Sequence, residues 1–212
     1  MNDAVADLGG GEGLFLESLG ERSARSVAVD HNAAAIERFT DKGGEGYVLG
    51  FDSFAQREKS HFDVVTSFHT LEHVADPVGI GEAAARCLRS GGRAFISVPN
   101  RDRSWREEGE PLDRPPHHVT RWAGDQLYRL ASLVGLQVEG LSFEPPDISV
   151  ARALIAVERG FGRSRSRIRN LAGRTWSIAS LSSSEHARRV RDGSYVREGI
   201  VGQSMMIEMR KA

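Results

Sequence analysis

The feature that most constrains this chain is a glycine-rich turn that follows a short apolar segment near the N-terminus. Residues 4–8 are apolar apart from Asp7, and glycine occupies four of the five positions 9–13. An amphipathic pattern over 14–19 then predicts a helix. Because glycine has no Cβ, the backbone of such a turn can bend tightly and approach a ligand closely. The first twenty residues therefore predict a strand, a ligand-binding turn and a helix.

A second predicted strand, over 26–30, ends in the acidic residue Asp30. At this point of a βαβ unit a carboxylate can accept hydrogen bonds from both hydroxyls of a ribose. The strand, the glycine turn, the helix and this acid together predict a nucleoside-binding unit. A glycine turn without a ligand is the alternative, and the positions of Asp7 and Asp30 argue against it.

The spacing of the glycines distinguishes between nucleoside cofactors. They follow a G-x-G-x-G pattern, with Leu14 at the position where the dinucleotide-binding pattern has its last glycine. No Lys-Ser or Lys-Thr pair follows, so a phosphate-binding P-loop is not expected. Asp7 suits a ligand with a cationic amino-acid portion. The pattern therefore favours S-adenosylmethionine over a nicotinamide dinucleotide, and a nicotinamide-dependent oxidoreductase is the less favoured alternative.

Strand and helix patterns alternate along the rest of the chain, which is typical of an α/β fold with a parallel sheet. Helices are predicted over 32–39, 77–88 and 125–134, and further strands over 45–49, 62–68, 93–98, 136–143 and 205–209. A polar, proline-rich loop of about twenty residues follows the strand that ends at Val98, and loops of this length are usually functional.

Four segments, in this order and spacing, resemble the class I S-adenosylmethionine-dependent methyltransferases. They are the glycine turn with Asp7, the strand end at Asp30, residues 62–74 and residues 88–100. Within the third segment, the stretch Leu-Glu-His-Val over 71–74 resembles the small-molecule branch, which includes the ubiquinone-pathway O-methyltransferases. The resemblance extends over about residues 4–150 and 200–212.

The resemblance implies a Rossmann-like, doubly wound sheet of seven strands in the order 3-2-1-4-5-7-6, with the last strand antiparallel. We expect residues 1–150 and 199–212 to form the methyltransferase domain. Residues 151–198 would form an Arg-rich helical insertion or cap. The family usually has a helix before the first strand, whereas three residues precede it here. We therefore expect either a native start upstream of Met1 or a pocket that is more open than usual.

The implied cofactor site lies across the C-terminal ends of the first four strands, where open α/β sheets bind ligands. The glycine turn would line the methionine portion, Asp30 would hold the ribose hydroxyls, and Phe51 and Asp52 would flank the adenine. The residues implied to bind S-adenosylmethionine are Asp7, Gly9, Gly10, Gly11, Gly13, Asp30, His31, Phe51, Asp52, Phe68 and His69.

Methyl transfer from a sulfonium requires an aligned nucleophile, and an oxygen or nitrogen acceptor that carries a proton also has to lose it. Histidine is the side chain best suited to take that proton near neutral pH. The candidates for a catalytic role are His69, His117 and His118, of which the last two lie in the long loop after residue 100. That loop reaches the substrate side in the relatives. A role in capping or bracing the following helix is the alternative for both.

His69, Glu72 and His73 also match the H-x-x-E-H spacing of a zinc site. In zinc hydrolases that motif lies within a helix, whereas here it straddles the end of a predicted strand. Some ubiquinone-pathway relatives bind a divalent cation through an acidic version of this stretch, with an acid at the position of His69. We therefore expect no metal, and we expect Glu72 and His73 to form hydrogen bonds at a helix start.

The charge distribution limits the expected partners. The formal net charge is −1, but residues 151–198 carry a net charge of +7. This segment could bind an anionic substrate or an acidic membrane surface, and a solvated helical cap is the alternative. Its few aromatic residues argue against stacking on nucleic-acid bases. Residues 67–70 also lack the signature of enzymes that methylate adenine or glutamine amides, so we expect no nucleic-acid partner.

The remaining composition points to a cytoplasmic protein, because the chain has one cysteine, Cys87, and no apolar run that could span a bilayer. The sequence as a whole predicts an enzyme that transfers a methyl group from S-adenosylmethionine to a small molecule, a lipid or a sugar. Oxygen is favoured over nitrogen as the acceptor atom. A catalytically silent binding or scaffold protein with the same fold is the alternative.

Overall fold

The computed structural model describes residues 3–103, 115–146, 183–197 and 201–212. The chain divides into two compact units. The first unit consists of Met1–Arg101, Gly109–Ser142 and Ser204–Ala212. The second consists of Asp102–Glu108 and Phe143–Gln203.

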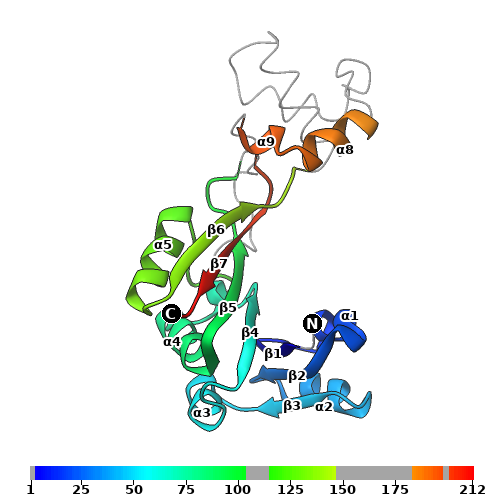
Figure 1. Cartoon of the computed structure of the whole chain (residues 1–212), viewed down its shortest axis with the longest axis vertical. Helices are drawn as coiled ribbons and strands as arrows, with labels where there is room; N and C mark the ends of the chain where they lie inside the picture. Colours follow the sequence, from blue (N-terminus) through cyan, green and yellow to red (C-terminus); the bar gives the residue numbers. More distant parts are fainter. Residues whose placement is uncertain (1–2, 104–114, 147–182, 198–200) are drawn as a thin grey trace. The chain divides into compact units, whose positions relative to one another are not determined.

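A seven-stranded sheet in the order β3-β2-β1-β4-β5-β7-β6 forms the centre of the fold (Figure 1). The strands are β1 (Asp3–Leu8), β2 (Ser23–Asp30), β3 (Glu45–Val48), β4 (Phe62–Phe68), β5 (Leu88–Pro99), β6 (Gln137–Phe143) and β7 (Ser204–Arg210). The pairs β1–β2, β1–β4, β2–β3 and β4–β5 are parallel, whereas β7 runs antiparallel to β5. The strand order and the antiparallel last strand confirm the expected Rossmann-like fold.

The helices of the first unit connect the strands and pack on the sheet. They are α1 (Leu14–Leu19), α2 (Ala33–Asp41), α3 (Phe51–Arg57), α4 (Pro77–Cys87) and α5 (Gly124–Leu133), with short 3-10 helices η1 (Gly20–Arg22) and η2 (Leu71–His73). Helices α1 and α2 pack on β1 and β2 through a buried apolar cluster that includes Leu16, Ala28 and Phe39. Helix α3, which the sequence analysis did not predict, packs against α4.

Side-chain caps explain where two of these helices begin. The Asn32 side chain accepts a hydrogen bond from the Ala35 amide at 3.2 Å, at the start of α2. Asp76 accepts one from the Gly79 amide at 3.0 Å, and Pro77 occupies the first turn of α4. A cap of this kind satisfies an amide that has no partner within the helix. Helix α4 therefore begins at Pro77, where the sequence predicts its start.

The core follows from the apolar runs of the central strands. Val27, Ala28 and Val29 of β2 are fully buried, as expected for strands that are covered on both faces. Cys87, at the end of α4, is also buried. Among the helices in the described ranges, none combines the length and hydropathy that a membrane span requires.

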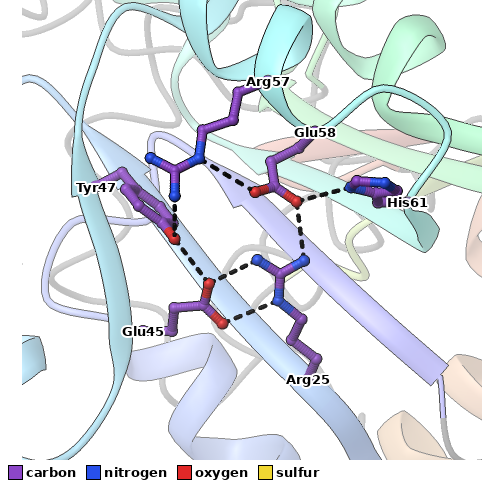
Figure 2. A network of polar contacts seen from close by, with 6 residues as sticks. All are labelled: Arg25, Glu45, Tyr47, Arg57, Glu58 and His61. Carbon is purple, nitrogen blue, oxygen red and sulfur yellow. Dashed lines mark hydrogen bonds and ion pairs between the residues drawn. The ribbon is translucent and has the colours of Figure 1, made fainter.

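A polar network braces α3 against the start of three strands (Figure 2). The Arg25 guanidinium bonds to Glu45 at 2.6 Å and to Glu58 at 2.9 Å. His61 lies 3.0 Å from the Glu58 carboxylate, whose side chain is 8% exposed. The hydrogen bonds from Arg25 hold the pKa of both carboxyl groups below the usual range. The network therefore stabilises the fold while the two acids are ionised.

The second unit contains two short described helices, α8 (Ser183–Arg191) and α9 (Ser194–Arg197). Arg188 pairs with Glu185 at 2.7 Å and with Asp192 at 2.8 Å. Part of the positive charge of the second unit is therefore neutralised within α8 and the turn that follows it. The His186 ring lies within hydrogen-bond distance of the Tyr195 hydroxyl, at 2.8 Å. The alternating arginines of 163–169 lie outside the described residues.

Candidate functional site

The glycine turn between β1 and α1 has a backbone that requires glycine. Gly9, Gly11 and Gly13 have φ angles of +85°, +53° and +74°, in the left-handed region that other residues rarely adopt. The amide of Gly9 donates to the Val29 carbonyl at 2.8 Å, and so does that of Gly10 at 3.3 Å. The turn is therefore fixed to the end of β2.

The surroundings of Gly9, Gly10 and Gly11 differ. A Cβ at Gly9 would lie 2.2 Å from the Thr70 hydroxyl oxygen, and one at Gly10 would lie 3.2 Å from the Ala28 Cβ. A Cβ at Gly11 would meet no described atom within 4 Å. The turn therefore presents its backbone to open space at Gly11, whereas at Gly9 and Gly10 it packs against the protein.

Asp30 lies directly beside this turn. One of its carboxylate oxygens accepts a hydrogen bond from the Gly11 amide at 3.0 Å, and the other accepts one from the Asn32 amide at 2.8 Å. These two bonds fix the orientation of a half-buried carboxylate at the end of β2. Each oxygen has a further lone pair that can accept a hydroxyl group. The structure therefore brings together the acid and the turn that the sequence singled out.

Asp7 is the second acid of the turn, and it is 4% exposed. The Thr66 hydroxyl of β4 donates to its carboxylate at 2.7 Å. The pKa of Asp7 is raised to about 6 as the net result of three effects: burial, the largest, raises it, the hydrogen bond from Thr66 lowers it, and the charge of Asp30 raises it. The ionised form of Asp7 is thus destabilised in the protein and would be favoured by a nearby positive charge.

The end of β4 supplies the predicted pair Phe68 and His69. The Phe68 ring packs edge-to-face against Phe15 of α1, with 4.9 Å between the ring centres. His69 has a φ angle of +50°, and its amide donates to the Ser97 carbonyl of β5 at 3.0 Å. Its Nδ1 atom lies 3.3 Å from the Glu72 carboxylate. A backbone conformation that histidine rarely adopts is therefore fixed here by contacts on both sides.

On the adenine side of the expected site, the structure brings together His31 and Phe51 but directs Asp52 elsewhere. The rings of His31 and Phe51 lie edge-to-face, with 5.1 Å between their centres. The Asp52 carboxylate pairs with Arg86 of α4 and accepts a hydrogen bond from Gln56 at 2.6 Å. An adenine contact through the side chain of Asp52 would have to compete with these two interactions.

A second cluster joins η2 to the loop before α5. The Glu72 carbonyl accepts hydrogen bonds from the Val119 amide at 2.8 Å and the Thr120 amide at 3.2 Å. His73 Nδ1 lies 2.7 Å from the His117 carbonyl, and the ring of His73 lies 4.9 Å from that of His118. The structure thus places His118 beside η2, whereas the described contact of His117 is made by its backbone.

A small pocket, too narrow in this structure to admit a water molecule, lies next to this cluster at the C-terminal end of β5. Its lining residues are Glu72, Pro99, Arg101, His118, Thr120, Arg121 and Trp122. The Trp122 indole donates to the Thr120 hydroxyl at 2.9 Å, and that hydroxyl donates to the Leu71 carbonyl at 3.0 Å. These contacts hold the loop against η2. Sequence reasoning did not single out Thr120 or Trp122, and the aromatic residue after the two histidines was the available signal.

Within the described ranges, three side chains could together hold a metal ion. Glu72, His73 and His118 each offer one ligand atom, and these atoms lie within 4.8 Å of one another. The Glu72 side chain is buried, that of His73 is exposed and that of His118 is half-buried. The H-x-x-E-H spacing pointed to His69, Glu72 and His73. In the structure, His118 takes the place of His69 in this set.

Comparison with known proteins agrees with the class that this fold defines. Among solved structures, a SAM-dependent methyltransferase from Archaeoglobus fulgidus matches with a TM-score of 0.66 at 16% identity, covering 99% of this chain and 86% of its own. A second S-adenosylmethionine-dependent methyltransferase, from Mesorhizobium loti, has a TM-score of 0.62 at 13% identity, with 99% and 91% coverage. At such identities the match concerns the fold.

Sequence comparison then identifies the family. The family model described as "Methyltransferase domain" matches residues 2–141. The ubiquinone biosynthesis O-methyltransferase of Idiomarina loihiensis is 34% identical over 108 residues, which are 48% of this chain and 44% of that protein. The enzyme of the same name from Hydrogenovibrio crunogenus is 31% identical over 107 residues, with the same coverage. The chain belongs to the methyltransferase-domain family, and the expected class, the class I S-adenosylmethionine-dependent methyltransferases, is confirmed. The chain spans less than half the length of these curated relatives.

Proposed function

We propose that this chain transfers a methyl group from S-adenosylmethionine to an oxygen atom of a small-molecule acceptor. The observation that carries the proposal is the Asp30 carboxylate, which the Gly11 and Asn32 amides hold beside the open part of the glycine turn. A fixed carboxylate next to an exposed backbone suits an adenosine ligand, because the carboxylate can accept both ribose hydroxyls.

The residues around this carboxylate fit the rest of the cofactor. The glycine turn would bind the methionine portion, and Asp7 would contribute negative charge close to a cationic group. His31 and Phe51 would bind the adenine, and Phe68 and His69 would face the cofactor from the end of β4. When bound, S-adenosylmethionine supplies an activated methyl group with a good leaving group. The protein then has to align an acceptor at about 3 Å from that methyl carbon and exclude water.

The relatives and the second cluster support the proposed acceptor class. The matched relatives are named as O-methyltransferases, which supports an oxygen acceptor on a small molecule, a lipid or a sugar. The pocket lined by His118 and Trp122 lies in the first unit, at the end of the neighbouring strand β5. We retain His69, His117 and His118 as candidates for contact with the acceptor and its proton.

The organisation of the chain supports a substrate-side role for its Arg-rich part. We propose that residues 1–150 and 199–212 form the methyltransferase domain and that 151–198 form an insertion or cap. Its net charge of +7 supports contact with an anionic partner or an acidic membrane surface. The single cysteine, which is buried, is consistent with a cytoplasmic location.

Calorimetric titration of the full chain with S-adenosylmethionine, S-adenosylhomocysteine and NAD tests the proposal. We expect binding of the two adenosyl sulfur compounds and no binding of NAD. Binding of NAD alone would favour an oxidoreductase instead. If none of the three ligands binds, the chain is a silent member of the fold and the proposed activity is refuted.

A further inference from the structure

We propose that Phe39 is a positioning residue for the methyl donor, because it holds the second half of the glycine turn in place before the donor binds. Phe39 has this role only if the turn binds S-adenosylmethionine, so the proposal rests on the proposed function. The second half of the turn consists of Glu12 and Gly13, which contact the consecutive residues Arg38 and Phe39 of α2. All four residues lie in the first unit.

The ring of Phe39 packs directly against two glycines. A Cβ at Gly13 would lie 2.2 Å from the ring atom Cδ2, and a Cβ at Gly44 would lie 2.5 Å from Cε1 and from Cζ. The ring therefore occupies the space that a side chain at either position would need. Phe39 itself is 4% exposed. The missing side chain of Gly13 thus admits the ring, and the ring in turn limits the movement of Gly13.

The residue before Phe39 adds a polar contact to the same half of the turn. The Arg38 guanidinium donates to the Glu12 carboxylate at 2.8 Å. The two side chains are 53% and 43% exposed, so this ion pair contributes little to the stability of the protein. The buried ring of Phe39 is therefore the main contact between α2 and the turn.

The turn needs such a contact because the remaining bonds of its second half are local. The amide of Gly11 donates to the Asp30 carboxylate at 3.0 Å, and that of Gly13 donates to the Gly10 carbonyl at 2.9 Å, within the turn itself. Glycine loses more conformational freedom on ordering than any other residue. A turn that is ordered only when the ligand binds loses this freedom at that moment, which lowers the affinity. Phe39 reduces this loss by fixing Gly13 beforehand.

Helix α2 also connects this contact to the ribose side of the proposed site. At the start of the helix, the Asn32 amide donates to the Asp30 carboxylate at 2.8 Å, and the Asn32 side chain caps the first turn. Phe39 follows about two turns later in the same helix, Ala33–Asp41. One rigid element therefore fixes Gly13 relative to Asp30.

Amide hydrogen exchange of the full chain without ligand tests the proposal. Phe39→Leu should speed the exchange of the Gly11 and Gly13 amides by about tenfold, because the turn then opens locally more often. Phe62→Leu is the matched control, since it shortens another fully buried ring, at the start of β4. It should lower the Tm as well but leave exchange in the turn unchanged. The methyl donor is absent from this measurement, so failure of this proposal is distinguishable from failure of the proposed function.

Calorimetry with S-adenosylmethionine gives a second readout. Phe39→Leu should bind about tenfold more weakly than the wild type, the cost of ordering about one backbone residue, while Phe62→Leu should bind as the wild type does. Gly44→Ala should also weaken binding, because its Cβ would displace the Phe39 ring. In the Phe39→Leu background the same substitution should have no further effect, since it acts through the ring.

The results that would overturn the proposal concern the same variants. It is overturned if Phe39→Leu matches Phe62→Leu either in exchange at the turn or in affinity for S-adenosylmethionine. It is also overturned if Gly44→Ala weakens binding equally in both backgrounds. If Phe39→Leu does not fold, Gly44→Ala decides, and unchanged exchange of the Gly13 amide in that variant refutes the role of the ring.

Discussion

The buried carboxylate of Asp7 predicts a specific dependence of stability on pH. Its pKa is raised from the usual 3.8 to about 6, with burial as the largest cause. A carboxyl group with a raised pKa binds its proton more tightly in the folded than in the unfolded state. Folding is therefore favoured most when Asp7 is protonated, and this contribution is lost as the pH rises from about 4 to about 6.

The size of the effect follows from the pKa difference. At about 1.4 kcal/mol per pKa unit, ionisation of Asp7 lowers the free energy of unfolding by about 3 kcal/mol above pH 6. Asp7→Asn removes this titration and keeps an oxygen that can accept the hydrogen bond from Thr66. The new amide group is buried and costs a similar amount at every pH, so the comparison rests on the slope and not on the absolute stability.

Urea unfolding of the wild type and of Asp7→Asn at a series of pH values between 4 and 7.5 measures the difference. The wild type should lose roughly 2 of these 3 kcal/mol relative to the variant between about pH 4 and about pH 6, and less than about 1 kcal/mol more above pH 6. Other titrating groups are common to both proteins and cancel in this difference. Parallel profiles would show that Asp7 ionises as it does in water, and they would refute the reasoning from burial.

Two further predictions concern stability. Gly9→Ala should destabilise the protein more than Gly11→Ala, because both residues have positive φ angles but only Gly9 lies against the Thr70 side chain. The backbone strain of an alanine at a positive φ angle costs about 1–2 kcal/mol at either position. Equal losses of unfolding free energy in urea would contradict the packing of the turn. Arg25→Ala should cost about 1–3 kcal/mol at pH 7 by breaking two ion pairs, one of them to a buried acid, and less at acidic pH, where the acids are protonated. Arg38→Ala, at an exposed ion pair, is the control and should cost less than about 1 kcal/mol.

The parts of the fold that could be predicted are those that local sequence determines. The strand, turn and helix around residues 4–19 follow from apolar periodicity and glycine spacing, and the start of α4 follows from its cap. The strand order followed from a family resemblance and not from the residues themselves. Helix α3 was not predicted because seven residues, Phe51–Arg57, are too few to show a clear helical period.

The candidate site could be predicted where its parts are close in sequence. Asp30 and the glycine turn meet because consecutive strands of a βαβ unit lie side by side. The contact of His118 with η2 depends on backbone hydrogen bonds between residues more than forty positions apart, which no local pattern encodes. The ion pair of Asp52 with Arg86 was likewise not predictable, because it depends on how α3 packs against α4.

The most direct measurement of the central claim is the affinity of the Asp30→Ala variant for S-adenosylmethionine, compared with that of the wild type by calorimetry. If the carboxylate holds both ribose hydroxyls, two hydrogen bonds to a charged group are lost, each worth about 1.5–3 kcal/mol. The affinity should then fall by at least about a hundredfold. Asp41→Ala, at the exposed end of α2, is the matched control and should bind as the wild type does. An unchanged affinity of Asp30→Ala would contradict the account.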